Sequence, residues 1–191
     1  MERSWKNQIW RFPVAGMKQN ILITGFMGAG KSSVARALAE LTGLFAVDTD
    51  DLIESLLHCS IKSYFVSHGE NAFRRLEQRL ANWLASSVDH TIVATGGGFF
   101  QVQGLMELGQ VCFLNADFDT ICRHLHVCAG DQQTVMRPLF QNLEAAKKRF
   151  DERLPLYRQN AHHIITVGTQ DSMDLARQIQ DILRQNGLLA Q

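Results

Sequence analysis

The sequence has no excess of charge of either sign and no long hydrophobic run. Its 191 residues contain 19 Lys and Arg against 19 Asp and Glu. A neutral chain gives no electrostatic reason to expect nucleic acid or an anionic membrane as a partner. No apolar stretch approaches the roughly 18 residues that a membrane-spanning helix requires. We therefore expect neither kind of partner.

Cysteine is scarce, and there are no internal repeats or low-complexity tracts. The cysteines show no spacing typical of a disulfide framework, which favours reduced thiols in the cytoplasm: Cys59, Cys112, Cys122 and Cys128. The run "CRHLHVC" has the residue types of a metal site. On a helix, however, Cys122 and His126 share one face while His124 and Cys128 share another, so the four side chains do not converge. We do not predict zinc here.

The chain is long enough for one well-buried domain and too short for two ordinary ones. Residues 1–16 lack the continuous apolar core of a signal peptide. We predict that they form a polar, poorly ordered N-terminal extension. A single domain, expected to be monomeric, then covers residues 17–191.

Short apolar strands alternate with amphipathic helices along this domain. The strands are predicted at 21–24, 44–47, 91–95, 111–116 and 164–167. Helices are predicted at 30–43, 51–58, 72–87, 118–127, 142–157 and 172–187. The helix at 72–87 carries an apolar stripe that should face the core, made of Phe73, Leu76, Leu80, Trp83 and Leu84. This alternation predicts an α/β fold with three αβα layers and a central five-stranded parallel sheet.

The segment "ITGFMGAGKSS" (23–33) satisfies the phosphate-loop pattern G-x-x-x-x-G-K-[ST] between a buried strand and a helix. Its backbone N–H groups and the positive helix end would hold phosphate. Lys31 would reach the β- and γ-phosphates of a nucleotide, and the Ser32 hydroxyl would hold Mg²⁺. We predict that this segment binds the phosphates of a nucleotide through Gly25, Gly28, Ala29, Gly30, Lys31, Ser32 and Ser33. The loop alone does not separate a motor, a switch, a nucleotide kinase and a small-molecule kinase.

Three carboxylates in "VDTDDLIE" follow the second strand, at the sheet edge where α/β proteins bind ligands. Capping a helix needs only one of them, and we assign that role to Asp51, with Glu54 three residues later. Asp48, close to the phosphate loop, is predicted to hold a water of Mg²⁺. Asp50 is predicted to accept a hydrogen bond or a proton from a substrate hydroxyl.

Four further segments carry arginines or consecutive glycines. Arg74 and Glu77 lie one helical turn apart, which is also typical of a surface ion pair. Gly96, Gly97 and Gly98 follow a strand, where they allow close approach of the backbone to another group. Arg137 lies in the polar stretch around 127–142, where we expect a mobile lid, and Arg153 lies near the end of the next helix.

In this order the motifs resemble the shikimate kinase family. They are G-x-x-G-x-G-K-S at 25–32, D-T-D at 48–50, G-E-x-x-F-R-x-x-E at 69–77, the triple glycine at 96–98, R-P-L at 137–139 and R-x-P-L-Y at 153–157. The resemblance implies a P-loop kinase fold and ATP-dependent phosphorylation of the shikimate 3-hydroxyl, giving shikimate 3-phosphate in the pathway to chorismate and the aromatic amino acids.

The resemblance also assigns roles to residues. Shikimate would lie between Asp50, Arg74, Gly96 to Gly98 and Arg153, and the two arginines would grip its carboxylate. Lys31, Asp50 and Arg137 would be catalytic, with Arg137 closing over the ATP phosphate that is transferred. Asp48 would serve the metal together with Ser32, because Thr95 stands where a generic P-loop ATPase has an aspartate. The second basic residue that family members carry before the lid arginine is missing here, so the adenine contacts stay open.

Two other functions remain possible at this stage. A kinase for a different hydroxy acid, such as gluconate, would keep Lys31 and Ser32 but would not need two arginines for a ring carboxylate. A nucleotide-dependent switch protein would carry a guanine-reading N-K-x-D motif, and the sequence has none.

Overall fold

The computed structural model describes residues 18–125 and 142–189. The predicted extension (1–16) lies outside the described residues, and so does the predicted lid except for Asn142. Arg137 and Cys128 therefore also lie outside them.

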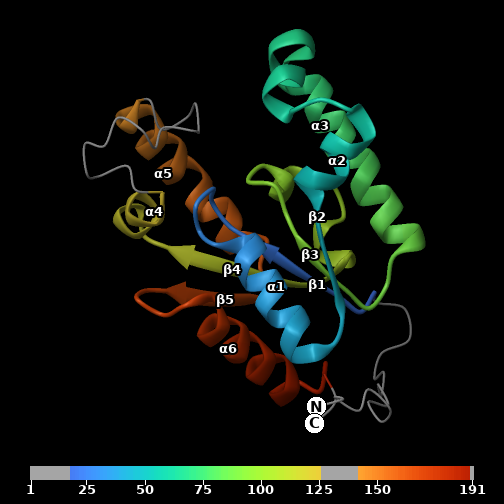
Figure 1. The fold of residues 1–191 in the computed structure, drawn as a ribbon, viewed down its shortest axis with the longest axis vertical. Helices are drawn as coiled ribbons and strands as arrows, with labels where there is room; N and C mark the ends of the chain where they lie inside the picture. The colour runs from blue at the N-terminus through green and yellow to red at the C-terminus, as the bar shows by residue number, and fades with distance from the viewer. Residues whose placement is uncertain (1–17, 126–141, 190–191) are drawn as a thin grey trace.

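A five-stranded sheet forms the centre of the molecule (Figure 1). Its strands are β1 (Asn20–Thr24), β2 (Phe45–Asp48), β3 (Thr91–Ala94), β4 (Gly109–Ala116) and β5 (His163–Val167). They are ordered β2-β3-β1-β4-β5, and every pairing is parallel. The central strand β1 is buried along its whole length, with Leu22 aligned between Val93 and Val111. The predicted five-stranded parallel sheet is confirmed.

In the described residues, six α-helices connect and cover the strands. They are α1 (Lys31–Thr42), α2 (Thr49–Leu57), α3 (Ile61–Ser87), α4 (Phe118–His124), α5 (Leu143–Gln159) and α6 (Ser172–Gln185), with the short 3₁₀ helices η1 (Phe99–Gln101) and η2 (Leu105–Glu107). Crossover connections between parallel strands are right-handed, so their direction across the sheet decides which face they cover. The connection from β1 to β2 therefore covers one face, and the later connections, which run in the opposite direction, cover the other. Figure 1 shows α1 and α6 packed side by side on one side of the sheet, with α3 and α5 on the opposite side. The three αβα layers are therefore confirmed.

The core lies on both faces of the sheet and holds its inner strands rigidly. The side chains of Leu22, Ile92 and Val111 have no exposed surface. Because the strands are parallel, the segments that follow β1, β2 and β3 all leave the sheet at the same edge. The phosphate loop, the aspartates after β2 and the three glycines after β3 lie at this edge.

The predicted apolar stripe of the helix at 72–87 is wrong at Trp83, whose side chain is 44% exposed. The buried face of α3 runs through Phe73, Glu77, Ala81 and Leu84. At 100° per residue, position 83 lies about 80° to one side of position 73, which turns Trp83 away from the core. The buried face therefore contains the carboxylate of Glu77, and the indole ring of Trp83 lies outside it.

Helix α3 also begins earlier than the sequence indicated. It starts at Ile61, where Ser60 Oγ accepts a hydrogen bond from the backbone N–H of Ser63. The helix is broken at Gly69, which has φ 75° and ψ 171°. Residues 61–68 therefore form a separate helical segment that the sequence pattern did not predict.

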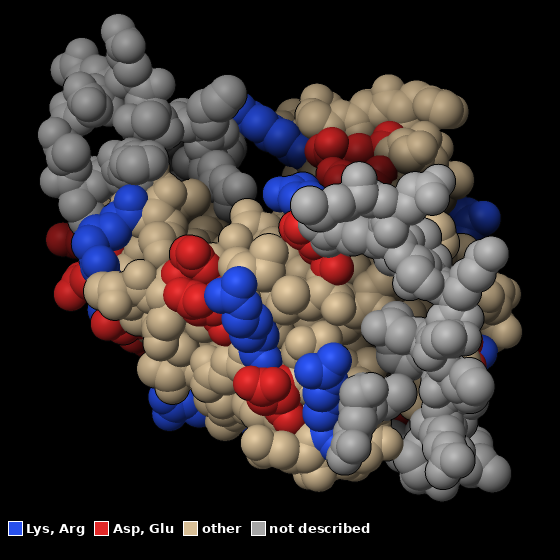
Figure 2. Space-filling model, turned by 60° about the horizontal axis from the view of Figure 1, so that its bottom comes forward, with Lys and Arg blue, Asp and Glu red and all other residues tan. Residues whose placement is uncertain are grey.

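The charged surface agrees with the balanced composition. On the face drawn in Figure 2, basic and acidic side chains of the described residues are interspersed and leave no extended area of one sign. In residues 18–125 and 142–189 no helix combines the length and the apolar character needed to cross a membrane.

Candidate active site

The phosphate loop joins β1 to α1 and depends on glycine at two positions. Gly28 has φ 83°, and a Cβ built there would lie 2.9 Å from the side chain of Leu125. Gly30 is the N-cap of α1 with φ 90°, and no side chain caps the helix. The first N–H groups of α1 thus face the loop and provide a site for an anion.

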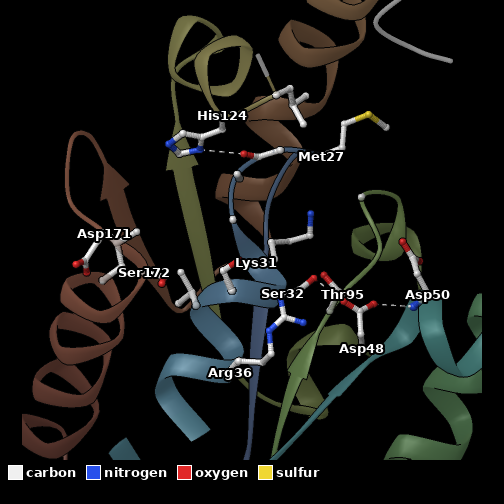
Figure 3. Close-up of a pocket in the computed structure, with 18 of the residues that line it drawn as sticks. Met27, Lys31, Ser32, Arg36, Asp48, Asp50, Thr95, His124, Asp171 and Ser172 are labelled. Carbon is white, nitrogen blue, oxygen red and sulfur yellow. Dashed lines mark hydrogen bonds between the residues drawn. The ribbon is translucent and has the colours of Figure 1, made fainter. Parts of the chain in front are cut away.

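Lys31 and Ser32 point into the space beside this loop (Figure 3). Lys31 Nζ donates to the carbonyl oxygen of Phe26 over 3.1 Å. The Ser32 hydroxyl donates to Asp48 Oδ2 over 2.6 Å. The hydrogen bond from Ser32 joins the phosphate loop to the end of β2, so the two residues predicted to serve one metal ion lie side by side.

Asp48 is also the N-cap of α2. Its Oδ1 accepts a hydrogen bond of 2.9 Å from the backbone N–H of Asp50. The predicted cap at Asp51 is therefore wrong, because α2 follows β2 without a loop and the last strand residue already has the extended φ and ψ of a cap. Glu54, predicted to complete the cap, accepts from the N–H of Ile61 instead.

Asp50 lies between the phosphate loop and the triple glycine. Burial, reinforced by the negative charge of Asp48, raises the pKa of Asp50 from 3.8 to about 6, while Lys31 acts in the opposite direction. A Cβ on Gly96 would overlap the Asp50 carboxylate. The Gly96 N–H donates to Thr49 Oγ1 over 2.7 Å, which ties the glycine turn to the first turn of α2.

Arg74 reaches the other end of the glycine turn from α3. Its guanidinium lies so close to Gly98 that a Cβ there would overlap it. Nη1 donates to Glu77 over 2.5 Å and Nη2 donates to Glu70 over 2.6 Å. The buried Arg74 Nε has no hydrogen-bond partner among the described residues. Burial raises the pKa of Glu77 despite the opposing charge of Arg74.

Arg153 approaches the same turn from α5. Its Nη1 donates to the carbonyl oxygen of Gly97 over 2.8 Å, and the Tyr157 hydroxyl donates to the same oxygen. The guanidinium lies over the Phe100 ring, 5.7 Å from its centre. Burial lowers the pKa of Arg153, and the positive charge of Arg74 acts in the same direction. The two arginines predicted to bind one carboxylate thus flank the same three glycines.

A cavity of about 760 Å³ runs along the phosphate loop and reaches this turn. Predicted residues line it: Gly28, Ala29, Gly30, Lys31, Ser32, Ser33, Asp48, Asp50 and Gly97. Arg74 and Arg153 are not among the residues that line the cavity. They contact the glycine turn itself, where Arg153 bonds the carbonyl oxygen of Gly97 and Arg74 lies beside Gly98.

The cavity wall includes residues that the sequence analysis did not assign to a site. Thr95, at the end of β3, donates its hydroxyl to the carbonyl oxygen of Ile23. His124 Nδ1 is 3.1 Å from the carbonyl oxygen of Gly28 and donates to it (Figure 3). Gln170–Ser172 follow β5 at the same sheet edge. Gln170–Ser172 could have been predicted from the sequence, because they follow a strand. His124 could not, because its place in the cavity wall depends on how α4 packs.

The oxygens of Ser32 and Asp48 fit a magnesium ion. Magnesium prefers oxygen ligands and is bound by one or two protein groups together with substrate phosphates. In the described part of the chain, no three His, Cys, Asp or Glu side chains gather as a metal cage would require. A hydroxyl beside a carboxylate, next to a phosphate loop, matches this sparse arrangement.

A parallel sheet of this order, with a phosphate loop after its central strand, defines the P-loop kinase fold. The family model described as shikimate kinase matches residues 27–184. The chain belongs to the shikimate kinase family.

Individual relatives agree with this assignment. The chain is 36% identical over 161 residues to a shikimate kinase of Helicobacter hepaticus, covering 84% of this chain and 93% of that protein. It is 38% identical over 166 residues to a shikimate kinase of Lactococcus lactis subsp. cremoris, covering 85% and 96%. Both matches include nearly the whole relative.

Solved structures give the same result. A shikimate kinase from Acinetobacter baumannii in complex with shikimate superposes with a TM-score of 0.76 at 30% identity, covering 87% of this chain and 93% of that one. A shikimate kinase from Bacteroides thetaiotaomicron superposes with a TM-score of 0.74 at 27% identity, covering 86% and 98%.

Proposed function

We propose that this protein transfers the γ-phosphoryl group of ATP to the 3-hydroxyl of shikimate, giving shikimate 3-phosphate and ADP on the route to chorismate. The observation that carries the proposal is the pair Arg74 and Arg153 on either side of a glycine turn, next to a phosphate loop. Phosphoryl transfer depends mainly on positioning the two substrates and neutralising charge. Membership of the family supports this reading.

On the nucleotide side, the loop from Gly25 to Ser33 binds the ATP phosphates through its N–H groups and the N-terminus of α1. Lys31 exchanges its hydrogen bond with the neutral Phe26 carbonyl for a stronger bond to charged phosphate oxygens. Arg137, outside the described residues, is assigned to the transferred phosphate by the family motif alone.

Ser32 and Asp48 would hold Mg²⁺. The hydrogen bond between them shows that the two oxygens already lie together at the mouth of the loop. Magnesium, when bound, neutralises charge on the β- and γ-phosphates.

On the acceptor side, Arg74 and Arg153 bind the carboxylate of shikimate, and the turn from Gly96 to Gly98 gives the ring room to approach the backbone. Asp50 orients the accepting hydroxyl and takes its proton. A pKa of about 6 suits this role, because the Asp50 carboxylate is mostly ionised at neutral pH yet basic enough to receive a proton.

We further propose that the protein acts in the cytoplasm as a monomer. The balanced charge and the lack of a long apolar run in the sequence give no reason to expect a nucleic acid or membrane partner.

The test is ADP release with a panel of acceptors, including shikimate, gluconate and quinate, with and without Mg²⁺. We expect release above the ATP background with shikimate only, and its loss when EDTA removes the metal. Release with gluconate but not shikimate would overturn the proposal and leave a kinase of another hydroxy acid. Mass spectrometry of the product checks that one phosphoryl group has been added.

A further inference from the structure

Both terminal nitrogens of Arg74 are already bonded to carboxylates of the protein itself. Nη1 donates to Glu77 and Nη2 donates to Glu70. The proposed function requires Arg74 to bind a third carboxylate, that of shikimate. Two of the five N–H groups of Arg74 are thus engaged, and a substrate carboxylate that takes the place of either partner would exchange one ion pair for another.

The two partners differ strongly in exposure. The side chain of Glu77 is 2% exposed, whereas that of Glu70 is 51% exposed. Glu77 belongs to the buried face of α3, and taking Arg74 away from it would leave a buried charge without this ion pair. Glu70 returns to water at little cost, because exposed ion pairs contribute little free energy. Glu70 is the partner that can leave.

The location of Glu70 also matches the expected place of a substrate carboxylate. The hydrogen bond from Arg74 lowers the pKa of Glu70 most, and the charges of Arg74, Arg149 and Arg153 act in the same direction. The Glu70 carboxylate thus lies in the combined field of the two arginines that are proposed to bind shikimate.

The geometry of the guanidinium favours the same exchange. A carboxylate binds Arg most strongly through two parallel N–H groups on one edge. Nε and Nη2 form one such edge, and there Nη2 is bonded to Glu70 while the buried Nε has no partner among the described residues. When Glu70 leaves, both nitrogens of this edge can donate hydrogen bonds to a substrate carboxylate.

We propose that Glu70 is an internal substitute for the substrate carboxylate: it occupies Arg74 in the free enzyme and is displaced when shikimate binds. This inference rests on the proposed function. It makes Glu70 a residue that lowers the affinity for shikimate by competition. The opposite role, in which Glu70 holds Arg74 in position for the substrate, predicts the opposite kinetic effect.

The test compares Glu70→Gln with the wild type, since Gln keeps the shape of the side chain and removes its charge. We expect the KM for shikimate to fall by about two- to fivefold, the range that an exposed ion pair of this kind can supply. The kcat, the KM for ATP and the melting temperature should stay close to those of the wild type. Shikimate methyl ester, which lacks the charge, should inhibit both proteins equally.

Asp174→Asn is the matched control. It removes an exposed carboxylate that accepts from Arg177 over 3.1 Å on α6, outside the proposed site. It should leave both KM values unchanged.

The outcomes separate the inference from the proposed function. A KM for shikimate that is unchanged or higher in Glu70→Gln, in a protein that melts normally, overturns the competition. An equal gain in affinity for the methyl ester overturns it too. If the wild type neither binds nor phosphorylates shikimate, the proposed function fails and the inference with it.

Discussion

Two of the three consecutive glycines are needed to leave space for a side chain, and the middle one is not. Gly96 and Gly98 give clearance to the Asp50 carboxylate and to the Arg74 guanidinium, and a Cβ at either position would overlap that side chain. Gly97 has more room, since its nearest neighbour would be 3.7 Å from a Cβ, and its carbonyl oxygen accepts hydrogen bonds from α5. The turn thus places two functional side chains by leaving space for them.

Gly98→Ala should therefore raise the KM for shikimate by about tenfold or more, because displacing Arg74 weakens a charged contact to the ligand. Its φ of −115° suits any residue, so backbone strain does not contribute. The KM for ATP should change little. Gly97→Ala, measured in parallel by steady-state kinetics, should show a much smaller effect. Equal effects of the two substitutions would show that the turn has no role in clearing Arg74.

We predict that the ionised carboxylate of Asp50 lowers the stability of the folded protein, although the proposed function needs it. Its pKa is about 6 in the folded protein against 3.8 in an ordinary environment, so the folded state keeps a proton that the unfolded state loses. Stability should therefore fall as pH rises from about 3.8 to about 6, and the loss should persist at higher pH.

Asp50→Asn removes this titration. At pH 7.5 it should increase the free energy of unfolding by about 1–3 kcal/mol, and the gain should vanish near pH 4. The kcat should drop at least about 100-fold, as expected when a general base is lost. Urea unfolding at the two pH values and turnover at pH 7.5 check both parts. A variant that is less stable than the wild type at pH 7.5 would contradict the burial argument.

At the level of elements, the sequence predicted those that pack on the sheet. All five strands and the helices at α1, α5 and α6 have apolar positions that the core buries, and periodicity reports burial. The segment 61–68 gave no such signal because it projects from the core, and Val66 within it is 84% exposed. A helix that buries little apolar surface has no stripe to detect.

The site was predictable to the extent that its geometry is local. The phosphate loop and the acids after β2 are short motifs at a strand end, and the structure places Ser32 beside Asp48 as expected. The partnership of Glu70 with Arg74 was not predicted, although both belong to one motif. Glu70 lies four residues before Arg74, which is a usual spacing for a helical ion pair, but spacing alone does not say whether an arginine bonds one acidic neighbour or two.

The break in α3 at Gly69 sets the direction of the residues that follow it, including Glu70 and Arg74. Gly69→Ala should reduce the free energy of unfolding by about 1–3 kcal/mol, because φ 75° with ψ 171° is a region that almost only glycine adopts. The space around a Cβ at this position is empty, so the cost is one of backbone conformation. Urea denaturation measures it.

Asn71→Ala serves as the control for this substitution. Asn71 is exposed and has helical geometry, and its replacement should change stability by less than about 0.5 kcal/mol. If Gly69→Ala is as stable as Asn71→Ala and has the shikimate KM of the wild type, the break is not a constraint on the site.

At the level of the whole molecule, one sheet edge collects groups that are far apart in the chain. The phosphate loop follows β1, the carboxylates follow β2 and the glycine turn follows β3, while the arginines come from helices behind the sheet. The parallel topology brings the first three groups together in space, although they lie far apart in the sequence.

The double role of Asp48 has a thermodynamic consequence for this arrangement. One oxygen of its carboxylate accepts from Ser32 in the phosphate loop, and the other holds the N–H of Asp50 at the start of α2. Binding of metal and nucleotide that reorients the first oxygen must also shift the second, because both belong to one rigid planar group. The two substrates are then linked, and linkage is reciprocal: whatever factor ATP imposes on the affinity for shikimate, shikimate imposes on the affinity for ATP.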